Sequence, residues 1–308
     1  MAARYPITVG ISTMDRPDAL ARCLDALLAS TMLPDEVLVI DQGHAPADAV
    51  IASRASAGPP LRHVRQPPNG LSAARNAMFE QACNPVVAVT DDDCVPGADW
   101  ILSIAGALQR EPMPDAVCGR VLALPQDGLR TYAVSLRADT TPADFTSQTI
   151  PWRVGTGANF AALREAVLAV GGYDERLGAG SKGQAAEDLD LALRLLRRGR
   201  RIRYEPEAIV YHERQPEERR MATRWSYAHG IGAVAGMLGR HRDRFAATML
   251  AAFGRDVLAR LVRSVRTRDR SGVRQALLSI GGAIDGVAYG WRVAPAPRRG
   301  KRAEAATQ

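Results

Sequence analysis

The sequence predicts an α/β protein: a mostly parallel sheet flanked by helices on both faces, followed by a helical C-terminal extension. Strand-like and helical stretches alternate along the first 213 residues. The strand-like stretches are apolar throughout, which is typical of parallel strands that are buried on both faces. From residue 216 onward only helical patterns remain, with Leu, Val, Ala and Met on one side and Arg on another.

The expected elements follow one another along the chain. Strands are expected at residues 6–12, 36–40, 61–65, 85–90, 116–124 and 154–162, with two more short strands at 201–211. Helices are expected at 17–30, 47–56, 72–83, 98–110, 163–170 and 187–198, and then at 217–240, 244–266 and 271–291. Residues 125–151 are expected to form a long loop or lid. We expect one domain over 1–213, a basic amphipathic helical extension over 214–292 and a disordered tail over 293–308.

Composition limits the classes of protein to consider. With 308 residues, 46% of them hydrophobic, the chain can bury a full core. Its four cysteines, at positions 23, 83, 94 and 118, form no CxxC pair, and we interpret them as reduced thiols of a cytoplasmic protein. The N-terminus lacks the apolar core of a signal peptide, and no run of about 18 apolar residues indicates a membrane-spanning helix.

Charge is unevenly distributed along the chain. Residues 214–308 hold 19 Lys and Arg against 7 Asp and Glu, a net charge of +12, whereas residues 1–213 hold 21 against 26, a net charge of −5. Two interpretations of the basic helices remain open. They contact the inner face of an anionic membrane peripherally, or they pack on the first domain with a solvated Arg face. With 5% aromatic residues and no recognised motif, the sequence does not indicate nucleic-acid binding.

Polar residues gather where the predicted strands end. Ser12 and Thr13 follow the first strand, Asp41 follows the second and Asp91–Asp93 follow the fourth. Because the carboxyl ends of parallel strands meet at one edge of the sheet, we expect these residues to share one crevice. Three adjacent carboxylates repel one another and raise each other's pKa unless a cation lies nearby. The sequence therefore predicts a positive partner at Asp91–Asp93.

A resemblance to a known family rests on six motifs in matching order: VGIST-DRP, VLVIDQG, NGLSAARN, VTDDDCVPGADWI, GGYDERLGAGSKGQAAEDLDLALRLLRRG and VYHE. Over about residues 6–213 the sequence resembles the family 2 glycosyltransferases with a GT-A, Rossmann-like fold. A lone DxD is common by chance, so the whole set makes the resemblance specific. It implies a nucleotide-sugar donor across the strand ends, Mn²⁺ or Mg²⁺ on the DxD, and an acid that deprotonates the acceptor hydroxyl in one inverting displacement.

The resemblance also implies a metal site and a catalytic pair. Asp93 matches the direct metal ligand of the DxD, Asp91 matches its partner toward the ribose, and His212 matches a histidine that often completes the site. Carboxylate oxygens and a neutral imidazole suit Mn²⁺ or Mg²⁺. Asp188 is the expected general base, and Glu187 the expected contact to acceptor or donor sugar. The alternatives are a solvated acidic turn, a loop histidine satisfied by backbone, and acids that only stabilise a helix N-terminus.

The expected donor-binding set lies along the strand ends and the helix after the third strand: Ser12, Thr13, Arg16, Asp41, Arg75, Asp91 and Asp92. By the resemblance, Asp41 contacts the nucleotide base, although Gln42 stands where many members have a second Asp. Arg75 is the expected diphosphate partner. The alternatives are a tight turn for Asp41 and a surface position for Arg75. In an extended strand Asp92 points away from its two neighbours, so no separate role follows for it.

The expected function is transfer of a sugar from a UDP donor, or next a dTDP donor, to a hydroxyl of a glycan, a lipid-linked glycan or a small molecule. Acceptor contacts are expected from residues 125–158 and from the helical extension. One alternative is a sugar-phosphate nucleotidyltransferase, but VGISTMDRP lacks the glycine-rich basic loop of that class. The other is an inactive nucleotide-sugar-binding protein, against which the intact acidic motifs argue. We expect a cytoplasmic protein, with or without peripheral contact at the inner face of the cell membrane.

Overall fold

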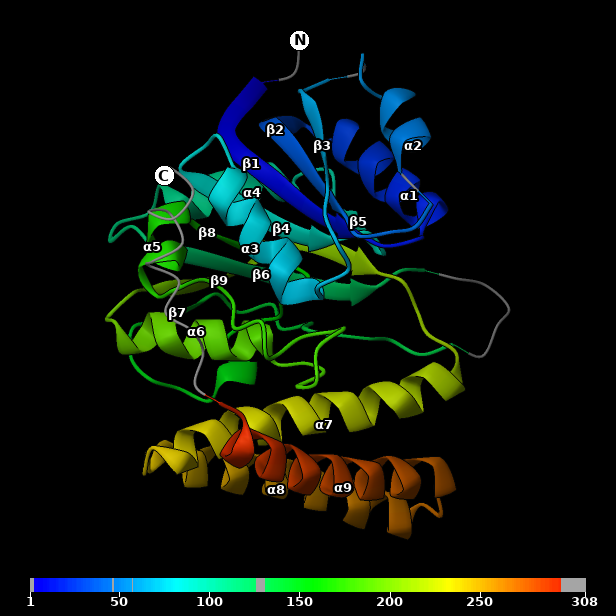
Figure 1. Ribbon diagram of the computed structural model, residues 1–308, viewed down its shortest axis with the longest axis vertical. Coiled ribbons are helices and arrows are strands. Elements are labelled where there is room, and N and C mark those ends of the chain that lie inside the picture. The colour runs from blue at the N-terminus through cyan, green and yellow to red at the C-terminus, as the bar shows by residue number, and fades with distance from the viewer. Residues whose placement is uncertain (1–2, 46, 57, 126–130, 295–308) are drawn as a thin grey trace.

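A nine-stranded sheet forms the centre of the molecule (Figure 1). The computed structural model describes residues 3–45, 47–56, 58–125 and 131–294. The strands are β1 (Ala3–Thr13), β2 (Met32–Asp41), β3 (Leu61–Arg65), β4 (Val86–Asp91), β5 (Cys94–Pro96), β6 (Ala116–Ala123), β7 (Ala143–Phe145), β8 (Phe160–Leu163) and β9 (Ile202–His212). The helices are α1 (Pro17–Leu28), α2 (Asp48–Ala52), α3 (Leu71–Gln81), α4 (Trp100–Leu108), α5 (Arg164–Ala169), α6 (Glu187–Arg197), α7 (Glu217–Arg240), α8 (Phe245–Arg266) and α9 (Arg270–Arg292), with a 3₁₀ turn at Pro151–Arg153.

The strand order is β3-β2-β1-β4-β8-β6-β9-β5, with β7 paired to β9. The first four of these strands are parallel, as predicted, and β6 is parallel to β9. Strand β8 is antiparallel to both β4 and β6, and β5 and β7 are antiparallel to β9. The sheet is therefore mixed, and the predicted parallel arrangement describes its first half.

Helices cover both faces of the sheet, which confirms the predicted α/β class. Helices α1, α2 and α4 pack on one face, in a core that includes Leu24, Ile104 and the strand residue Val39. Helices α3, α5 and α6 pack on the other face, in a core that includes Met78 and the strand residue Leu38. Because successive residues of β2 enter opposite cores, this strand is apolar along most of its length.

Strand β9 corrects the prediction of two short strands at 201–211. It is one strand that ends at His212, and its pairing with β6 shifts register after Gly119. Asn159 compensates for the lost pairing, because its Nδ2 donates to the carbonyl oxygen of Ala208 at 2.8 Å. The bulge therefore interrupts the sequence pattern without ending the strand.

The region predicted as a long loop contains more structure. Within 125–151, β7 pairs with β9, and Tyr132 forms an isolated bridge with Gln215 just before α7. Residues 126–130 lie outside the described residues, as do 295–308, which make up most of the predicted disordered tail. Strand β5 and the 3₁₀ turn have no counterpart in the prediction.

Helices α7, α8 and α9 form a layer beyond α6, and Figure 1 shows α7 between the sheet and the other two. Leu193 of α6, Val234 of α7 and Met249 of α8 share one core, which joins this layer to the rest of the molecule. The boundaries predicted for separate domains stay a prediction. In the part of the chain that the structure describes, no helix has the length and apolar character needed to cross a bilayer.

Glycines allow α7 and α9 to approach closely. A Cβ at Gly286 of α9 would lie 2.0 Å from the carbonyl oxygen of His229, and one at Gly290 would lie 2.1 Å from that of Ala233. Both partners are backbone atoms of α7, which cannot move aside independently. The glycines therefore set the distance between the two helices.

Candidate functional site

The register of the sheet brings the predicted strand-end residues together. Ser12 of β1 lies opposite Asp91 of β4, and Thr13 lies opposite Asp41 of β2. All four residues therefore occupy the carboxyl edge of three adjacent parallel strands, which is where open α/β sheets bind their ligands.

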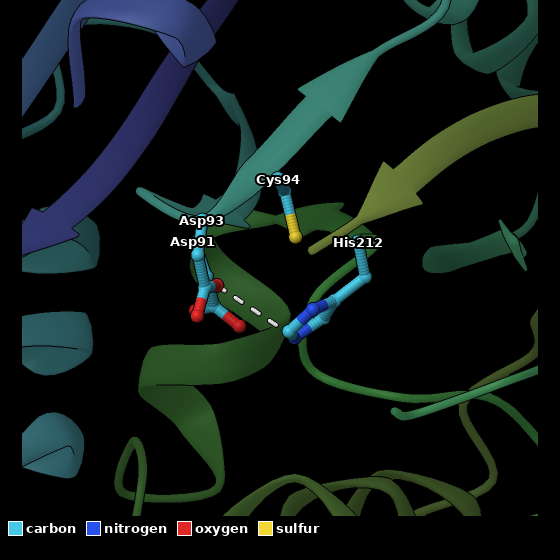
Figure 2. Close-up of side chains that lie close together, drawn as sticks. All are labelled: Asp91, Asp93, Cys94 and His212. Carbon is cyan, nitrogen blue, oxygen red and sulfur yellow. Dashed lines mark ion pairs between the residues drawn. The ribbon is translucent and has the colours of Figure 1, made fainter. Parts of the chain in front are cut away.

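The acidic triplet forms a turn that gathers candidate metal ligands. Strand β4 ends at Asp91, the next two residues turn, and β5 begins at Cys94, which pairs with His212 of β9. Ligand atoms of Asp91, Asp93, Cys94 and His212 all lie within 4.8 Å of one another. Figure 2 shows both carboxylates near the imidazole, with Oδ1 of Asp93 3.6 Å from Nε2 of His212.

Backbone contacts orient His212 as a ligand. Its Nδ1 lies 2.9 Å from the carbonyl oxygen of Glu213. A carbonyl oxygen only accepts, so Nδ1 carries the proton, and in the neutral ring Nε2 keeps its lone pair. Because Nε2 faces Asp93, the lone pair points toward the carboxylates, as in metal-ligating histidines.

Cys94 belongs to the cluster by position, although the sequence assigned it no role. Burial raises the pKa of its thiol, and Asp91 and Asp93 raise it further. A protonated sulfur is a poor ligand for a hard cation. The oxygen and nitrogen atoms of the other three residues are therefore the candidate ligands.

Arg16 brings a positive charge to the acidic turn. Its Nη1 donates to Oδ1 of Asp92 at 3.1 Å and to Oδ2 of Asp93 at 2.9 Å, and Thr13 Oγ1 donates to Oδ2 of Asp92 at 2.9 Å. Burial raises the pKa of Asp92 to about 6, against the attraction of Arg16. The extended geometry on which the expectation for Asp92 depended is absent here, because β4 ends at Asp91 and the next two residues turn. The two oxygens of Asp92 hold Thr13 and Arg16, and its contact with a donor stays a prediction.

Arg75 is 1% exposed and lies between two carboxylates. Its Nη2 donates to Oδ1 of Asp91 at 2.9 Å, and its Nη1 donates to Oε1 of Glu187 at 2.7 Å. Burial alone would lower the pKa of Arg75, but Asp91 and Glu187 raise it above its ordinary value. Arg75 is therefore a buried bridge and not a surface arginine, and its contact with a diphosphate stays a prediction.

Glu187 opens α6 after Ala186, whose φ of 69° is left-handed. The Glu187 side chain is buried. Burial and the neighbouring Asp188 raise the pKa of Glu187 to about 7, against the effect of Arg75. The Glu187 carboxyl therefore titrates near neutral pH.

Asp188 is held by two backbone groups. Its Oδ2 accepts from the N–H of Gly157 at 2.7 Å, and its Oδ1 accepts from the N–H of Leu189 at 2.8 Å. A Cβ at Gly157 would lie 2.4 Å from Nη1 of Arg75. A glycine at this position therefore lets one segment of backbone contact both Asp188 and the arginine bridge.

Asp41 stabilises the turn that follows β2. It is 1% exposed, and its oxygens accept from the N–H groups of Gly43 at 2.8 Å and Ala47 at 3.0 Å and lie 3.1 Å from Nε2 of His63. Burial acts to raise the pKa of Asp41, but these hydrogen bonds outweigh it and lower the pKa. These contacts match the tight-turn alternative, and a contact with a nucleotide base stays a prediction.

A cleft of about 730 Å³ opens beside these residues. The predicted site residues that line it are Arg75, Asp91, Glu187, Asp188 and His212. Its other walls come mainly from residues 132–136, 152–158 and α7, where acceptor contacts were expected. The remaining predicted residues lie outside the lining, at or near the strand ends: Ser12, Thr13, Arg16, Asp41, Asp92 and Asp93.

Sequence reasoning did not identify several polar side chains of the cleft: Tyr132, Gln215, Arg220, Arg224, Tyr227 and Arg260. Helical spacing does indicate that Arg220, Arg224 and Tyr227 share one face of α7. No local signal marks Arg260, because its place depends on how α8 packs against α7.

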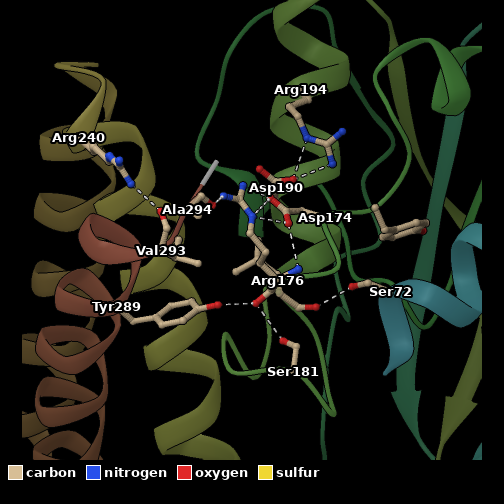
Figure 3. A network of polar contacts seen from close by, with 12 residues as sticks. Ser72, Asp174, Arg176, Ser181, Asp190, Arg194, Arg240, Tyr289, Val293 and Ala294 are labelled. Atoms are coloured by element: carbon tan, nitrogen blue, oxygen red, sulfur yellow. Dashed lines mark hydrogen bonds and ion pairs between the residues drawn. The ribbon is translucent and has the colours of Figure 1, made fainter. Parts of the chain in front are cut away.

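The glycine-rich loop before α6 is tied to the helical layer (Figure 3). Arg176 Nε donates to Oδ1 of Asp174 at 2.8 Å, and Nη1 donates to the carbonyl oxygen of Ala294, just after α9. The hydroxyl of Tyr289 in α9 donates to the carbonyl oxygen of Arg176 at 3.1 Å. Because this loop leads directly into α6, the contacts help to fix the start of the helix that carries the paired acids.

Comparison with known proteins identifies a family. The chain matches the model for glycosyl transferase family 2 over residues 8–171, more than half of its length. It is 26% identical over 229 residues to glucosyl-dolichyl phosphate glucuronosyltransferase of Haloferax volcanii, covering 68% of this chain and 69% of that protein. It is 28% identical over 203 residues to pre-mycofactocin glycosyltransferase of Mycobacterium tuberculosis, covering 64% of this chain and 41% of that protein.

Solved structures share the fold at low sequence identity. The mannosyltransferase PcManGT from Pyrobaculum calidifontis, in complex with GDP-Man and Mn²⁺, has a TM-score of 0.62 and 18% identity, covering 94% of this chain and 88% of that chain. S. aureus TarS 1–349 has a TM-score of 0.61 and 14% identity, covering 92% and 81%. These likenesses confirm the GT-A fold, and the family match confirms the resemblance and favours sugar transfer over nucleotidyl transfer. The chain belongs to glycosyl transferase family 2 and is a glycosyltransferase.

Proposed function

We propose that this protein is a metal-dependent, inverting glycosyltransferase that uses a nucleoside-diphosphate sugar, with UDP as the first donor to test and dTDP as the second. One observation carries the proposal: the Asp91–Asp93–His212 cluster adjoins a cleft whose wall also holds Glu187 and Asp188. The acceptor is a hydroxyl of a glycan, a lipid-linked glycan or a small molecule. The Haloferax volcanii relative is named for a glucosyl-dolichyl phosphate, which supports the lipid-linked class.

The residues of the cluster fit Mn²⁺ or Mg²⁺. Two carboxylates and an imidazole with a free Nε2 lone pair are ligands that both ions accept, Mn²⁺ more readily for the nitrogen. The Mn²⁺ in the PcManGT structure supports this choice. When bound, the metal neutralises charge on the leaving diphosphate. Arg16 and Arg75 balance the same carboxylates from the protein side.

Asp188 is the proposed general base. The N–H groups of Gly157 and Leu189 fix its carboxylate on the wall of the cleft, which favours a defined distance to a bound hydroxyl. Asp188 takes the proton as the acceptor oxygen forms its bond to the anomeric carbon and the bond to the diphosphate breaks. A single displacement of this kind inverts the anomeric configuration. Glu187 holds Arg75 and contacts one of the two sugars.

The test measures nucleoside diphosphate release from a panel of UDP and dTDP sugars, with Mn²⁺, Mg²⁺ or EDTA. We expect release that requires metal and that falls by about 100-fold or more in Asp93→Ala and Asp188→Asn. Asp256→Asn, at an exposed aspartate of α8, is the matched control and keeps full activity. Full activity of Asp93→Ala would show that the metal site is misplaced.

Two further outcomes separate the alternatives. Binding of a nucleotide sugar without any release, in the presence of every acceptor class, would identify an inactive binding protein. The anomeric configuration of the product, read by NMR coupling constants, tests inversion directly. A retained configuration would refute the single displacement.

We also propose a peripheral contact with anionic membranes through the outer face of α8 and α9. Exposed apolar side chains recur at helical spacing on both helices: Leu258, Val262 and Val265 on α8, and Leu277, Ile280 and Ile284 on α9. Exposed arginines of the same helices, such as Arg255 and Arg274, flank them. This combination of apolar and basic side chains suits an anionic lipid surface. Helix α7, in contrast, lines the cleft, which supports the other interpretation of the basic helices, that they pack on the first domain.

Sedimentation with vesicles tests the membrane contact. We expect binding to phosphatidylserine-containing vesicles at low salt, and loss of binding in a Leu258→Asp/Ile284→Asp variant. Leu102→Asp, at an exposed leucine of α4, is the control and binds as the unmodified protein does. If the unmodified protein stays in the supernatant at low salt, the contact does not exist.

A further inference from the structure

Three arginines from two helices line the cleft. Arg220 and Arg224 lie four residues apart on α7, and Arg260 comes from α8. Residues at positions i and i+4 share one face of a helix, so the first two arginines lie side by side. Like charges at this spacing, near the positive end of a helix dipole, destabilise the helix. The arrangement therefore lacks an evident benefit for folding.

Acidic partners for these arginines are scarce. Arg220 Nη1 donates to Oε2 of Glu217 at 3.3 Å, and its guanidinium lies 3.9 Å from the ring centre of Tyr132. The other carboxylate oxygen of Glu217 accepts from Oγ of Ser271 at 2.5 Å. Within the described residues, the side chains of Arg224 and Arg260 have no ion pair and no hydrogen bond. Glu217 thus offsets one positive charge of three.

The uncompensated charges act on one another. Burial lowers the pKa of Arg224, and the positive charges of Arg260 and Arg220 lower it further. A guanidinium nevertheless stays protonated at neutral pH. The cleft wall therefore carries about two uncompensated positive charges, and a bound anion would reduce the repulsion between them.

Tyr227 of α7 lines the same cleft as these arginines and the carboxylates. Desolvation of the phenol raises the pKa of Tyr227 to about 12, and the negative charges of Asp188, Glu187 and Asp91 add to this effect. The charged groups that act on Arg224 are instead Arg260 and Arg220, besides Tyr227 itself. The arginines come from α7 and α8, whereas the carboxylates that we assign to the metal and the base come from the end of β4 and the start of α6, so the two sets enter the cleft from different elements.

We propose that Arg220, Arg224 and Arg260 form a subsite for a phosphate monoester or diphosphate carried by the acceptor. The inference rests on the proposed function and specifies its acceptor class as hydroxyl compounds that bear such a group. A guanidinium group can donate two parallel hydrogen bonds to the oxygens of one phosphate. A phosphate monoester carries a charge of about −1.5 to −2 at neutral pH, which is close in magnitude to the uncompensated positive charge of the arginines. The diphosphate of the donor has the same chemistry, so the test must separate the two sources.

The test uses calorimetric titration of the full chain with inorganic phosphate in EDTA, and separately with UDP and Mn²⁺, at constant ionic strength. Arg224→Gln and Arg260→Gln each raise the Kd for phosphate by about tenfold to a hundredfold, since each removes a charge-assisted hydrogen bond. Arg110→Gln, at an exposed arginine just after α4 that lies outside the cleft lining, is the matched control and changes it less than about twofold. The Kd for UDP with Mn²⁺ stays within about twofold in all three variants, and phosphate still binds protein saturated with UDP and Mn²⁺. If Arg224→Gln fails to fold, the Kd for phosphate of Arg260→Gln tests the same subsite through a residue of α8.

Several results would overturn the inference. They are phosphate binding that is absent in the unmodified protein, binding unchanged in both glutamine variants, or competition between phosphate and UDP. A parallel loss of UDP binding in the variants would assign the arginines to the donor and also overturn it. Failure of the unmodified protein to bind UDP would count against the donor proposal alone, because the phosphate titration contains neither donor nor metal.

Discussion

Arg75 Nη1 donates a 2.7 Å hydrogen bond to Oε1 of Glu187 and so joins helices α3 and α6. The same guanidinium holds Asp91 of the acidic turn. A single buried cation therefore connects the proposed metal cluster to the paired acids at the start of α6. Any shift of Arg75 changes both ends of the site together.

Replacing Arg75 should damage both stability and catalysis. Arg75→Gln leaves two carboxylates near an uncharged amide, and loss of one partner of a buried ion pair costs about 3–5 kcal/mol of unfolding free energy. Arg75→Lys keeps the charge but cannot reach both carboxylates with a planar fork, so kcat/KM should still fall by about 100-fold. Chemical denaturation and steady-state rates measure the two effects.

A double-mutant cycle checks the cause of the Arg75 effect. In Arg75→Gln/Glu187→Gln the second change removes a stranded buried carboxylate, so part of the lost stability should return. If the two changes are simply additive, Arg75 and Glu187 do not interact in solution as they do in the structure.

Activity should depend on pH through Glu187. Burial and Asp188 raise the pKa of Glu187 to about 7, so the carboxyl is largely neutral below that pH and charged above it. Only the charged form attracts Arg75 fully, so kcat/KM should rise with pH through an inflection near 7. Glu187→Gln should lower the activity and remove this inflection. An inflection that persists unchanged in the variant would assign the titration to another group.

The site was predictable from sequence where its residues follow strands in a recognisable order. The apolar runs predicted at 6–12, 36–40 and 85–90 indicated three parallel strands, and parallel strands align their carboxyl ends whatever the rest of the fold does. The pairing of Asp92 with Arg16 was not predictable, because it depends on the turn that Asp92 and Asp93 form after β4, which the strand pattern does not specify.

The second half of the molecule was less predictable because its order comes from contacts between distant segments. Strand β7 has three residues and exists by pairing with β9, about 60 residues later. The bulge in β9 depends on Asn159, whose side chain satisfies a carbonyl group there. Arg260 reaches the cleft through the packing of α8, which the helical period of α8 does not specify.

Acid should loosen the loop that precedes α6. Burial acts to raise the pKa of Asp174, but hydrogen bonds from the side chain and backbone of Arg176 outweigh it, so the folded-state pKa is lowered. A lowered pKa means that the ionised carboxylate stabilises the fold above the unfolded value of about 4, and that this contribution is lost as pH falls through the folded-state value. The Tm of the unmodified protein should therefore fall between pH 5 and 3 more steeply than that of Asp174→Asn. Asp256→Asn, at an exposed site, should follow the unmodified protein, and equal slopes for all three would contradict a role for Asp174.

Two glycine substitutions should change stability in opposite directions. At Gly286 of α9 an added Cβ would lie 2.0 Å from the carbonyl oxygen of His229, whereas at Gly254 of α8 it would meet no atom within 4 Å. Gly286→Ala must push α9 away from α7, and overpacking of this kind costs about 1–3 kcal/mol. Gly254→Ala removes only the helix penalty of glycine and should add about 0.5–1 kcal/mol. Unfolding in urea measures both, and a stabilised Gly286→Ala would mean that α7 and α9 do not pack this closely.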